Sequence, residues 1–118
     1  MCIFCKIIEG EIPSNKVLED DDFLAFHDIN PAAPVHLLVI PKVHVDNFQQ
    51  ISPDLMAKMT EFIQKVTTLL ELDLNGYRLI TNNGEDGGQE VGHLHFHILG
   101  GTKLSWHKHD DANPQETI

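Results

Sequence analysis

The segment that decides the fold is "HLHFHIL", residues 93–99, in which one apolar residue separates each pair of histidines. Alternate side chains of a β-strand point to opposite faces of its sheet. His93, His95 and His97 therefore share one face of a predicted strand, and the apolar residues between them face the core. Neighbours in such a row lie roughly 6.6 Å apart and its ends roughly 13 Å apart. Two neighbouring histidines can reach one metal ion and all three cannot do so easily, so we expect the row to serve more than one task.

Imidazole suits chemistry on phosphate esters and amides near neutral pH. One ring can attack phosphorus while another donates a proton to the leaving group, because the imidazole pKa lies in that range. The attack gives a covalent phospho-histidine, which water then opens. Such chemistry needs groups that bind phosphate oxygens. The preceding loop, residues 82–92, offers backbone N–H groups and the side-chain amides of Asn82 and Gln89. A simple hairpin turn is the alternative for this loop when it is taken alone.

Length and composition are those of one ordinary globular domain. The chain has 118 residues, of which 42% are hydrophobic and 22% are charged. We expect the domain to cover residues 1–106 and a polar tail to cover residues 107–118. The formal net charge is −10, from 18 acidic and 8 basic residues. That charge argues against a nucleic acid polymer as partner, because such a site must neutralise many phosphates. A local pocket can still bind one small nucleotide.

The sequence contains no membrane-spanning or secretory pattern. No apolar run approaches the roughly 18 to 20 residues that a membrane span needs. A secretory signal has a basic segment followed by a long apolar one. The N-terminus of this chain lacks that pattern. We therefore expect a cytoplasmic protein without a membrane partner.

Hydrophobic periodicity predicts an α+β chain with elements in the order α, β, β, β, α, β, β. The predicted helices cover residues 3–11 and 52–72. The predicted strands cover residues 15–20, 22–29, 35–41, 75–82 and 93–101. Ser52 is a natural N-cap for the long helix, and Pro53 suits its first turn. Three strands before the long helix and two after it predict an antiparallel sheet with the helices on one face.

Cys2 and Cys5 form the pattern C-x-x-C near the start of the chain. Two cysteines so close together are too few for a disulfide framework. In a reducing compartment the pattern indicates a metal-ligand pair, a redox pair or two bystanders. A redox pair is disfavoured because the cysteines do not follow a strand in a thioredoxin-like unit.

Together these segments resemble the histidine triad (HIT) family, whose signature is H-φ-H-φ-H-φ-φ with φ apolar. Residues 93–99 match it at all seven places, and the likeness extends over residues 3–44, residues 76–101 and Trp106. This combination resembles the HINT branch, the nucleoside phosphoramidases and adenylyl-amine hydrolases. The resemblance implies a HIT-like fold with a five-stranded, mainly antiparallel sheet, a short N-terminal helix and one long helix. It also implies a two-fold homodimer, in which the long helices and the strands after them meet.

The resemblance further implies a reaction, the hydrolysis of purine nucleoside 5′-phosphoramidates such as AMP joined to a lysine amine, through a covalent nucleotidyl-histidine. His95 would be the nucleophile, His97 would bind phosphate and assist the leaving group, and His36 would support the nucleophilic ring. The implied nucleotide-binding residues are Phe4, Ile7, Phe26, His27, Asp28, Ile29, Asn82, Gln89, Glu90, Val91 and His97. Glu90 stands where many relatives have serine, which predicts an altered leaving-group preference.

Some HIT relatives with an N-terminal C-x-x-C bind zinc, so the resemblance implies a structural zinc site here. Zinc in a closed structural site needs four ligands. Cys2 and Cys5 supply two, and His44 and His93 are the candidates for the others. No cofactor is expected for catalysis. An unmetallated cysteine pair remains the alternative.

Three other functions compete with a phosphoramidase. A nucleotide-binding scaffold with vestigial hydrolysis would bind AMP without turnover. A zinc-dependent hydrolase using His95 and His97 as ligands would lose activity on chelation. A diadenosine-polyphosphate hydrolase of the same family is the mildest rival, and residues 87–101 with Trp106 favour the HINT branch over it.

Overall fold

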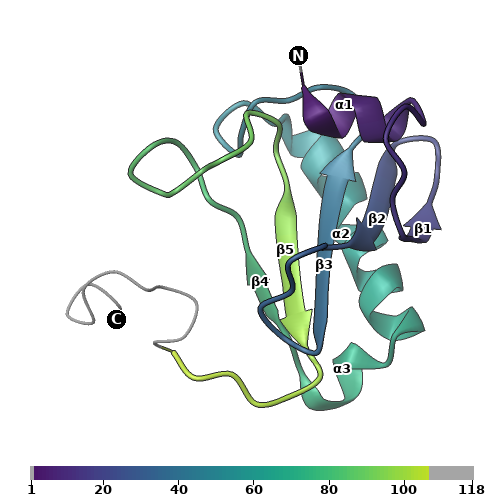
Figure 1. Cartoon of the computed structure of the whole chain (residues 1–118), viewed down its shortest axis with the longest axis vertical. Coiled ribbons are helices and arrows are strands. Elements are labelled where there is room, and N and C mark those ends of the chain that lie inside the picture. The colour runs from purple at the N-terminus through teal and green to yellow at the C-terminus, as the bar shows by residue number, and fades with distance from the viewer. Residues whose placement is uncertain (1, 107–118) are drawn as a thin grey trace.

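The structure, a computed structural model, describes residues 2–106. Residue 1 and the predicted polar tail, residues 107–118, lie outside the described residues. Five strands form one antiparallel sheet in the order β1-β2-β3-β5-β4 (Figure 1). The strands are β1 (Lys16–Glu19), β2 (Phe23–His27), β3 (Val35–Pro41), β4 (Arg78–Ile80) and β5 (Phe96–Gly100). The antiparallel α+β fold predicted from the sequence is confirmed.

Helix α1 (Ile3–Ile8) and helix α2 (Pro53–Leu69) lie where the periodicity predicted helices. The Ser52 hydroxyl accepts a hydrogen bond from the Leu55 N–H at 3.1 Å, as an N-cap does. The long helix ends earlier than predicted, because Glu71 adopts the left-handed conformation (φ 59°). A separate short helix, α3 (Leu72–Asn75), follows that break.

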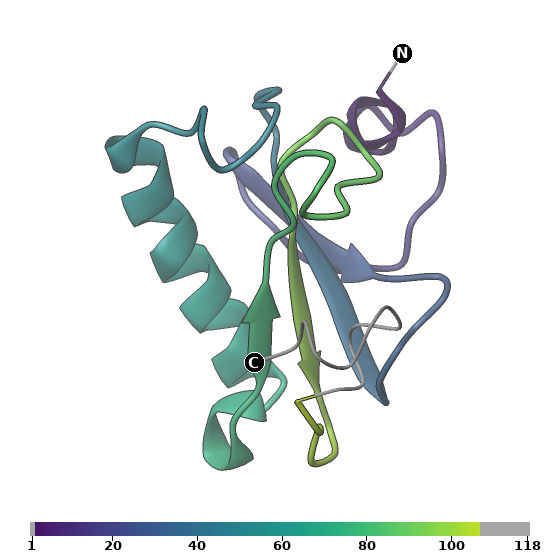
Figure 2. The same ribbon diagram turned by 90° about the vertical axis from the view of Figure 1, so that its left-hand side faces the viewer.

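The two main helices cover opposite faces of the sheet, so the prediction that both lie on one face is wrong (Figure 2). Strands β2 and β3 are apolar at nearly every position. Phe23 and Ala25 of β2 therefore face α2, whereas Leu24 and Phe26 face α1. A strand that is apolar on both faces needs a cover on each side, and one helix cannot supply both.

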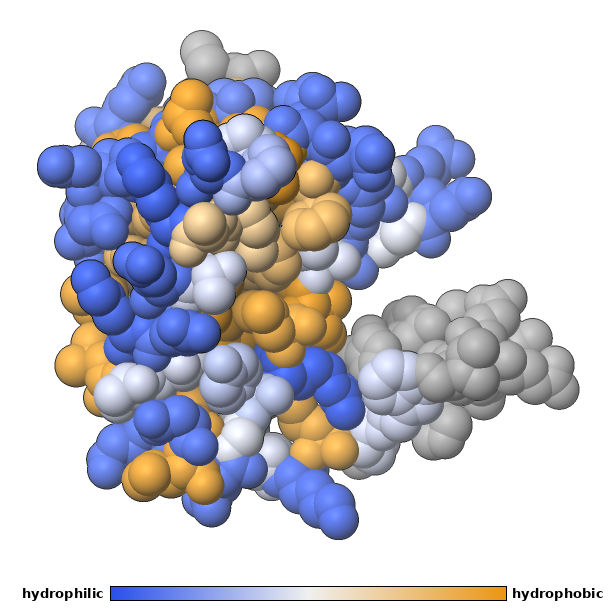
Figure 3. Space-filling model, turned by 180° about the vertical axis from the view of Figure 1, so that it is seen from behind, coloured by the Kyte–Doolittle hydropathy of each residue, from blue (hydrophilic) through white to orange (hydrophobic). Residues whose placement is uncertain are grey.

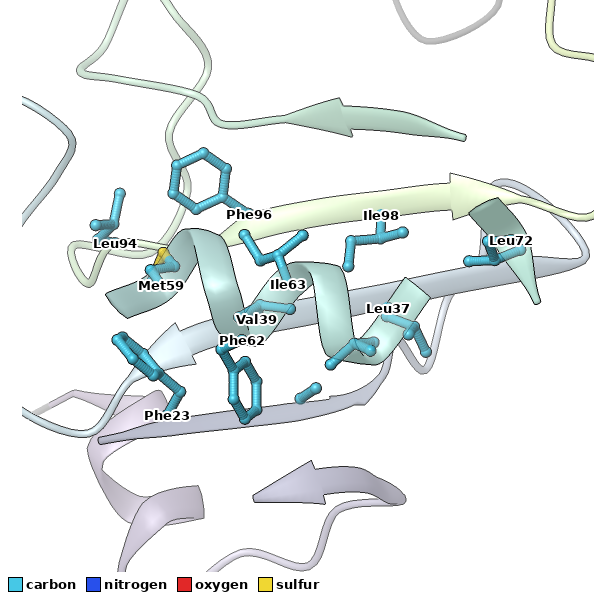
Figure 4. Close-up of a cluster of buried hydrophobic side chains, with 12 residues drawn as sticks. Phe23, Leu37, Val39, Met59, Phe62, Ile63, Leu72, Leu94, Phe96 and Ile98 are labelled. Atoms are coloured by element: carbon cyan, nitrogen blue, oxygen red, sulfur yellow. The ribbon is translucent and has the colours of Figure 1, made fainter. Parts of the chain in front are cut away.

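The larger core lies between the sheet and α2 (Figure 4). Helix α2 contributes Met59, Phe62, Ile63 and Val66 to this core, and each is at most 4% exposed. The apolar residues that alternate with the histidine row, residues 94, 96 and 98, also point into it, as the alternation predicted. The histidine row consequently lies on the α1 side of the sheet.

Strand β5 begins at Phe96, three residues later than predicted. His93 and His95 therefore lie just before the ladder, with His93 in a bend, and His97 lies inside the ladder opposite Leu38 of β3. The Leu94 N–H donates to the Val45 carbonyl at 2.7 Å instead of continuing the β3 pairing. Among the described residues, no helix has both the length and the apolar character to cross a membrane.

Candidate active site

His95 is a buried histidine with one ring nitrogen fixed by the main chain. Its Nδ1 lies 2.8 Å from the His93 carbonyl oxygen, which can only accept a hydrogen bond. The Nδ1 atom therefore carries the proton, and in the neutral ring Nε2 keeps its lone pair. The Thr81 hydroxyl, directly after β4, donates to the His95 carbonyl at 2.8 Å and holds the same segment. His95 thus presents a nitrogen that is ready to act as a nucleophile.

His36 and His97 form a second, directional pair. The Ala32 N–H donates to His36 Nδ1 at 2.9 Å, so the proton of the neutral His36 ring is on Nε2. His36 Nε2 lies 2.9 Å from His97 Nδ1 and donates to it. The neutral His97 ring then carries its own proton on Nε2. His36, which was predicted to support the nucleophilic ring of His95, thus bonds to His97 and fixes a donor on His97 Nε2.

Burial keeps this pair neutral. Burial, with smaller contributions from the nearby His95 and His36 rings, lowers the pKa of His97 to about 4. Burial also lowers the pKa of His36, although the Asp28 carboxylate acts in the opposite direction. Both rings are therefore uncharged at pH 7, in agreement with the hydrogen-bond directions.

Asp28 follows β2 and lies beside the histidine pair. Its Oδ1 accepts a hydrogen bond from the Asn30 N–H at 2.8 Å, and its Oδ2 lies 3.5 Å from His36 Nε2. The second oxygen keeps capacity to accept further hydrogen bonds, since a carboxylate has about four acceptor positions. Asp28 is therefore suited to bind hydroxyl groups of a ligand.

These groups surround a cavity of about 290 Å³. The cavity is lined by Phe4, Asp28, Leu38, Asn82, Gly88, Glu90, Val91, His95 and His97. The lining thus combines imidazoles, carboxylates, an amide and apolar side chains. A cavity with this mixture can hold a flat apolar group and an anionic group side by side.

The glycine-rich loop, residues 82–92, lines one part of the cavity. A Cβ on Gly87 would overlap the Asn83 carbonyl, and Gly88 has a positive φ of 78°, so both positions need glycine. Asn82 Nδ2 donates to the Gly87 carbonyl at 2.8 Å and closes the loop. Gly88 itself lines the cavity, which brings backbone to the position where a side chain would stand.

Gln89, predicted to bind the nucleotide, is occupied within this loop. Its Oε1 accepts from the Gly84 N–H at 2.9 Å, and its Nε2 donates to the carbonyls of Asp46 at 2.7 Å and Val91 at 3.0 Å. It does not line the cavity. The side chain thus shapes the loop, and direct phosphate binding by Gln89 stays a prediction.

The residues predicted for the base pocket fall into two groups. Ile7 and Phe26 are buried beside Phe4 in the smaller core under α1. His27 is exposed, and Ile29 is 91% exposed. The structure therefore packs Ile7 and Phe26 against Phe4, whereas it leaves His27 and Ile29 open to solvent.

Cys2, Cys5, His44 and His93 form a second cluster, called here the Cys/His cluster. Their ligand atoms all lie within 4.8 Å of one another. His93 Nδ1 is 3.1 Å from Cys2 Sγ, and His44 Nδ1 is 3.3 Å from Cys5 Sγ. The sequence reasoning had nominated these four residues, and the structure brings them together from opposite ends of the chain.

The two imidazoles of the Cys/His cluster are oriented as metal ligands. His93 Nε2 donates to the Pro41 carbonyl at 2.8 Å, and His44 Nε2 donates to Asp46 Oδ1 at 3.0 Å. Each Nδ1 therefore turns a lone pair toward the thiols. A hydrogen-bonded far nitrogen is the usual arrangement behind a histidine ligand. Two thiols with two such imidazoles match the donor set of a structural zinc site.

The Cys5 thiol of the Cys/His cluster favours its protonated form. Desolvation, together with the neighbouring Cys2, raises the pKa of Cys5 to about 11. A bound cation reverses that preference, because thiolates are the species that ligate metal.

Asp28, His36 and His97 also lie close enough together to hold a metal ion. Here, however, the His36 proton already points at the His97 lone pair, so the two nitrogens satisfy each other. This arrangement fits a hydrogen-bonded pair better than a metal centre.

A model of the HIT domain matches residues 9–104, most of the chain. The chain belongs to the HIT family. The HIT-like fold predicted from residues 93–99 is thereby confirmed, with a five-stranded antiparallel sheet and helices on both of its faces.

Relatives of this HIT protein cover nearly its whole length. An uncharacterised HIT-like protein of Helicobacter pylori is 56% identical over 103 residues, which are 87% of this chain and 99% of that protein. A crystal structure described as a HIT family hydrolase from Legionella pneumophila Philadelphia 1 is 45% identical with a TM-score of 0.85, covering 90% of this chain and 97% of that one. A crystal structure described as a histidine triad nucleotide-binding protein from Candida albicans is 39% identical with a TM-score of 0.79, covering 90% and 82%.

Sequence reasoning missed the groups that orient the HIT histidines. Thr81 and the Ala32 N–H, described above, gave no signal in the sequence, because each acts through a contact that only the fold creates. Asp46 was detectable, since a carboxylate two residues after His44 is the kind of group that supports a histidine ligand.

Proposed function

We propose that this HIT protein hydrolyses purine nucleoside 5′-phosphoramidates, such as AMP joined to a lysine amine, through a covalent nucleotidyl-histidine. The observation that carries the proposal is the free Nε2 lone pair of His95 beside a cavity that also contains Asp28. The relatives described as a hydrolase and as a nucleotide-binding protein support the same class of activity. The proposal places the chain in the HINT branch.

In the proposed complex the nucleotide lies along the cavity. Phe4 contributes the apolar wall for the base, and Asp28 accepts hydrogen bonds from the ribose hydroxyls. Asn82, the Val91 backbone amide and His97 Nε2–H serve the phosphate oxygens. These assignments rest on the position of each group at the cavity and on its donor or acceptor character.

In the first chemical step, His95 Nε2 bonds to phosphorus and the P–N bond breaks. The amine departs with the electron pair of that bond and takes up one proton from solvent. The phosphorylated ring gains positive charge, and the His93 carbonyl, which accepts the Nδ1–H hydrogen bond, stabilises it.

In the second step, water attacks phosphorus, the bond to His95 breaks and the water releases one proton. The sum is the consumption of one water molecule, with AMP and a free amine as products. His97 acts as a neutral donor to the phosphate throughout, and His36 holds its tautomer.

Glu90 is an exposed carboxylate at the rim of the cavity. An anion at this place repels an anionic leaving group and attracts a cationic one. We therefore propose that amines carrying a positive charge are the preferred leaving groups.

We propose zinc as the occupant of the Cys/His cluster, where it would contribute stability and would not contact the reacting atoms. The support is the donor set, two thiols and two correctly oriented imidazoles. Metal analysis of the purified protein tests this directly. Replacing Cys2 and Cys5 by alanine is expected to lower Tm by more than about 5 °C. A protein that binds no zinc would contradict the assignment.

We propose a homodimer through α2 and β4. Strand β4 is an edge strand of the sheet, and its Leu79 side chain is 44% exposed. Leu69 at the end of α2 is 57% exposed, beside a surface hollow along that helix. Figure 3 shows apolar side chains among polar ones on the side of the molecule opposite to the view of Figure 1. An apolar edge of this kind is suited to pairing with a second copy.

A cytoplasmic location stays a prediction.

The deciding experiment is a turnover assay with AMP linked to a primary amine, with and without a chelator. The nucleotidyl-histidine intermediate is then trapped with labelled substrate, and the protein is isolated without acid. Turnover that survives chelation, with label on His95, supports the proposal. Turnover abolished by chelation, without a labelled intermediate, would favour the zinc-dependent hydrolase. Tight AMP binding without any turnover would favour the scaffold.

A further inference from the structure

We infer that the Cys/His cluster positions the nucleophile, with His93 and Phe4 as the two positioning residues that connect it to His95. The inference rests on the proposed role of His95, but it does not depend on the identity of the amine. The two sites share residues of one short segment, because His93 belongs to the cluster and His95 lies two positions further on.

His93 is the first connection. Its ring is completely buried, and the Pro41 carbonyl and the two thiols hold it at opposite nitrogens. The main-chain carbonyl of the same residue accepts the hydrogen bond from His95 Nδ1. A change in the position of the His93 ring therefore moves the peptide group that selects the His95 tautomer.

The strand ladder does not hold this peptide group. Strand β5 begins at Phe96, after His95, so regular pairing starts too late to fix the His93 carbonyl. The neighbouring anchors are the Leu94 N–H on Val45 and the Thr81 hydroxyl on the His95 carbonyl. The Leu94 N–H belongs to the same planar peptide group as the His93 carbonyl, so its bond to Val45, one residue after His44 of the cluster, helps to fix the direction of that carbonyl. The direction thus depends on how the segments that carry His44 and His93 are held.

Phe4 is the second connection. It lies on α1 between the two cysteines, and its ring centroid is 5.9 Å from that of His93 and 5.1 Å from that of His95, edge-on in both cases. Helix α1 has only six residues, too few to be stable in isolation. Its place on the sheet therefore depends on its apolar contacts and on the Cys/His cluster. A metal that joins both cysteines to His93 would hold Phe4 against the nucleophile and the cavity wall.

The test uses the wild-type protein, loaded with Zn²⁺, stripped by a chelator and then reloaded, below the Tm of each form. Long-range ¹H–¹⁵N NMR of the histidine rings reports which nitrogen carries the proton. We expect a single Nδ1–H tautomer of His95 in the zinc-loaded protein and a mixture with the Nε2–H tautomer after stripping, restored by zinc. His97 is the internal control, because His36 and not the cluster fixes its tautomer.

Variants test the same connection without a chelator. Cys2→Ser with Cys5→Ser should give the mixed His95 tautomer and lower kcat about tenfold, the size of effect typical of groups that support a site from outside. Cys5→His keeps four zinc ligands and should restore the single tautomer. Met59→Ala, on the opposite face of the sheet, should lower Tm and leave the His95 spectrum unchanged.

A single His95 tautomer in both the stripped protein and the double serine variant would overturn the inference. A mixed His95 tautomer in Met59→Ala would also overturn the inference, because a general loss of stability would then explain the effect. If the tautomer responds to zinc while no AMP-amine is cleaved, the coupling stands and the proposed function fails.

Discussion

His95 donates a hydrogen bond from Nδ1 to the main-chain carbonyl of His93 at 2.8 Å. This contact divides the histidine row by task. The ring of His93 faces the cysteines, its carbonyl orients His95, and the Nε2 lone pair of His95 is left for chemistry. Two neighbouring residues of one sequence motif therefore serve two different sites.

Replacing His95 by alanine should remove phosphoramidase turnover by at least about three orders of magnitude, because the nucleophile is lost. AMP binding should persist, since the other groups lining the cavity remain. Steady-state kinetics and calorimetric titration with AMP measure the two effects. Activity within about tenfold of wild type would show that another residue attacks phosphorus.

Replacing Asp28 by asparagine should weaken recognition of the ribose. Asparagine can still accept the hydrogen bond from the Asn30 N–H, so the local turn should survive. It offers fewer acceptor positions to two hydroxyls, and we expect KM for AMP-amines to rise about tenfold. The matched control is a 2′,3′-dideoxynucleotide substrate, whose KM should not change. Equal losses for both substrates would place Asp28 elsewhere in the mechanism.

Replacing Glu90 by serine should reduce the preference for cationic amine leaving groups. The ratio of kcat/KM between a lysine-type and a neutral amine substrate should fall about three- to tenfold, as expected for loss of one partly exposed charge. Glu85→Ser is the control, because Glu85 is an exposed acid of the same loop that does not line the cavity. An unchanged ratio in Glu90→Ser, or an equal change in Glu85→Ser, argues against the charge contact.

Acid should destabilise the protein partly through His97. Its pKa is about 4 in the folded chain and lies near 6.5 for a free histidine. Between these values the unfolded chain binds more protons, so stability is full above about pH 6.5 and is lost as pH falls toward 4. Chemical denaturation at pH 7.5 and pH 5 measures this loss. His97→Asn should show a smaller loss over that interval, and an equal loss would assign the effect to other groups.

Replacing Leu79 by glutamate should disrupt the proposed dimer, because it places charge on the exposed edge strand. Sedimentation velocity should show a monomer for this variant and a dimer for wild type. Val43→Glu, at another exposed apolar position, should remain dimeric. A monomeric wild type would contradict the proposed dimer. A dimeric Leu79→Glu variant would place the interface on a different surface.

The sequence by itself determined the strand alternation and the separation of the two residue sets. Histidine at every second position of residues 93–97 is sufficient to predict which side chains point to the core, because the two-residue period of a strand needs no tertiary information. The order of helices and strands follows from local periodicity in the same way. The four cluster residues were also within reach, through the resemblance to HIT relatives that carry an N-terminal C-x-x-C.

Tertiary structure alone decided the tautomers and the layering. Each histidine tautomer depends on an acceptor or donor brought by folding, such as Ala32 for His36 and His36 for His97, and sequence spacing does not encode these contacts. The placement of α1 and α2 on opposite faces follows from strands that are apolar on both sides, which a one-sided sheet cannot bury. Hydrogen-bond direction is a property of neighbours in space, and for that reason the tautomer of His95 became assignable only when the chain was folded.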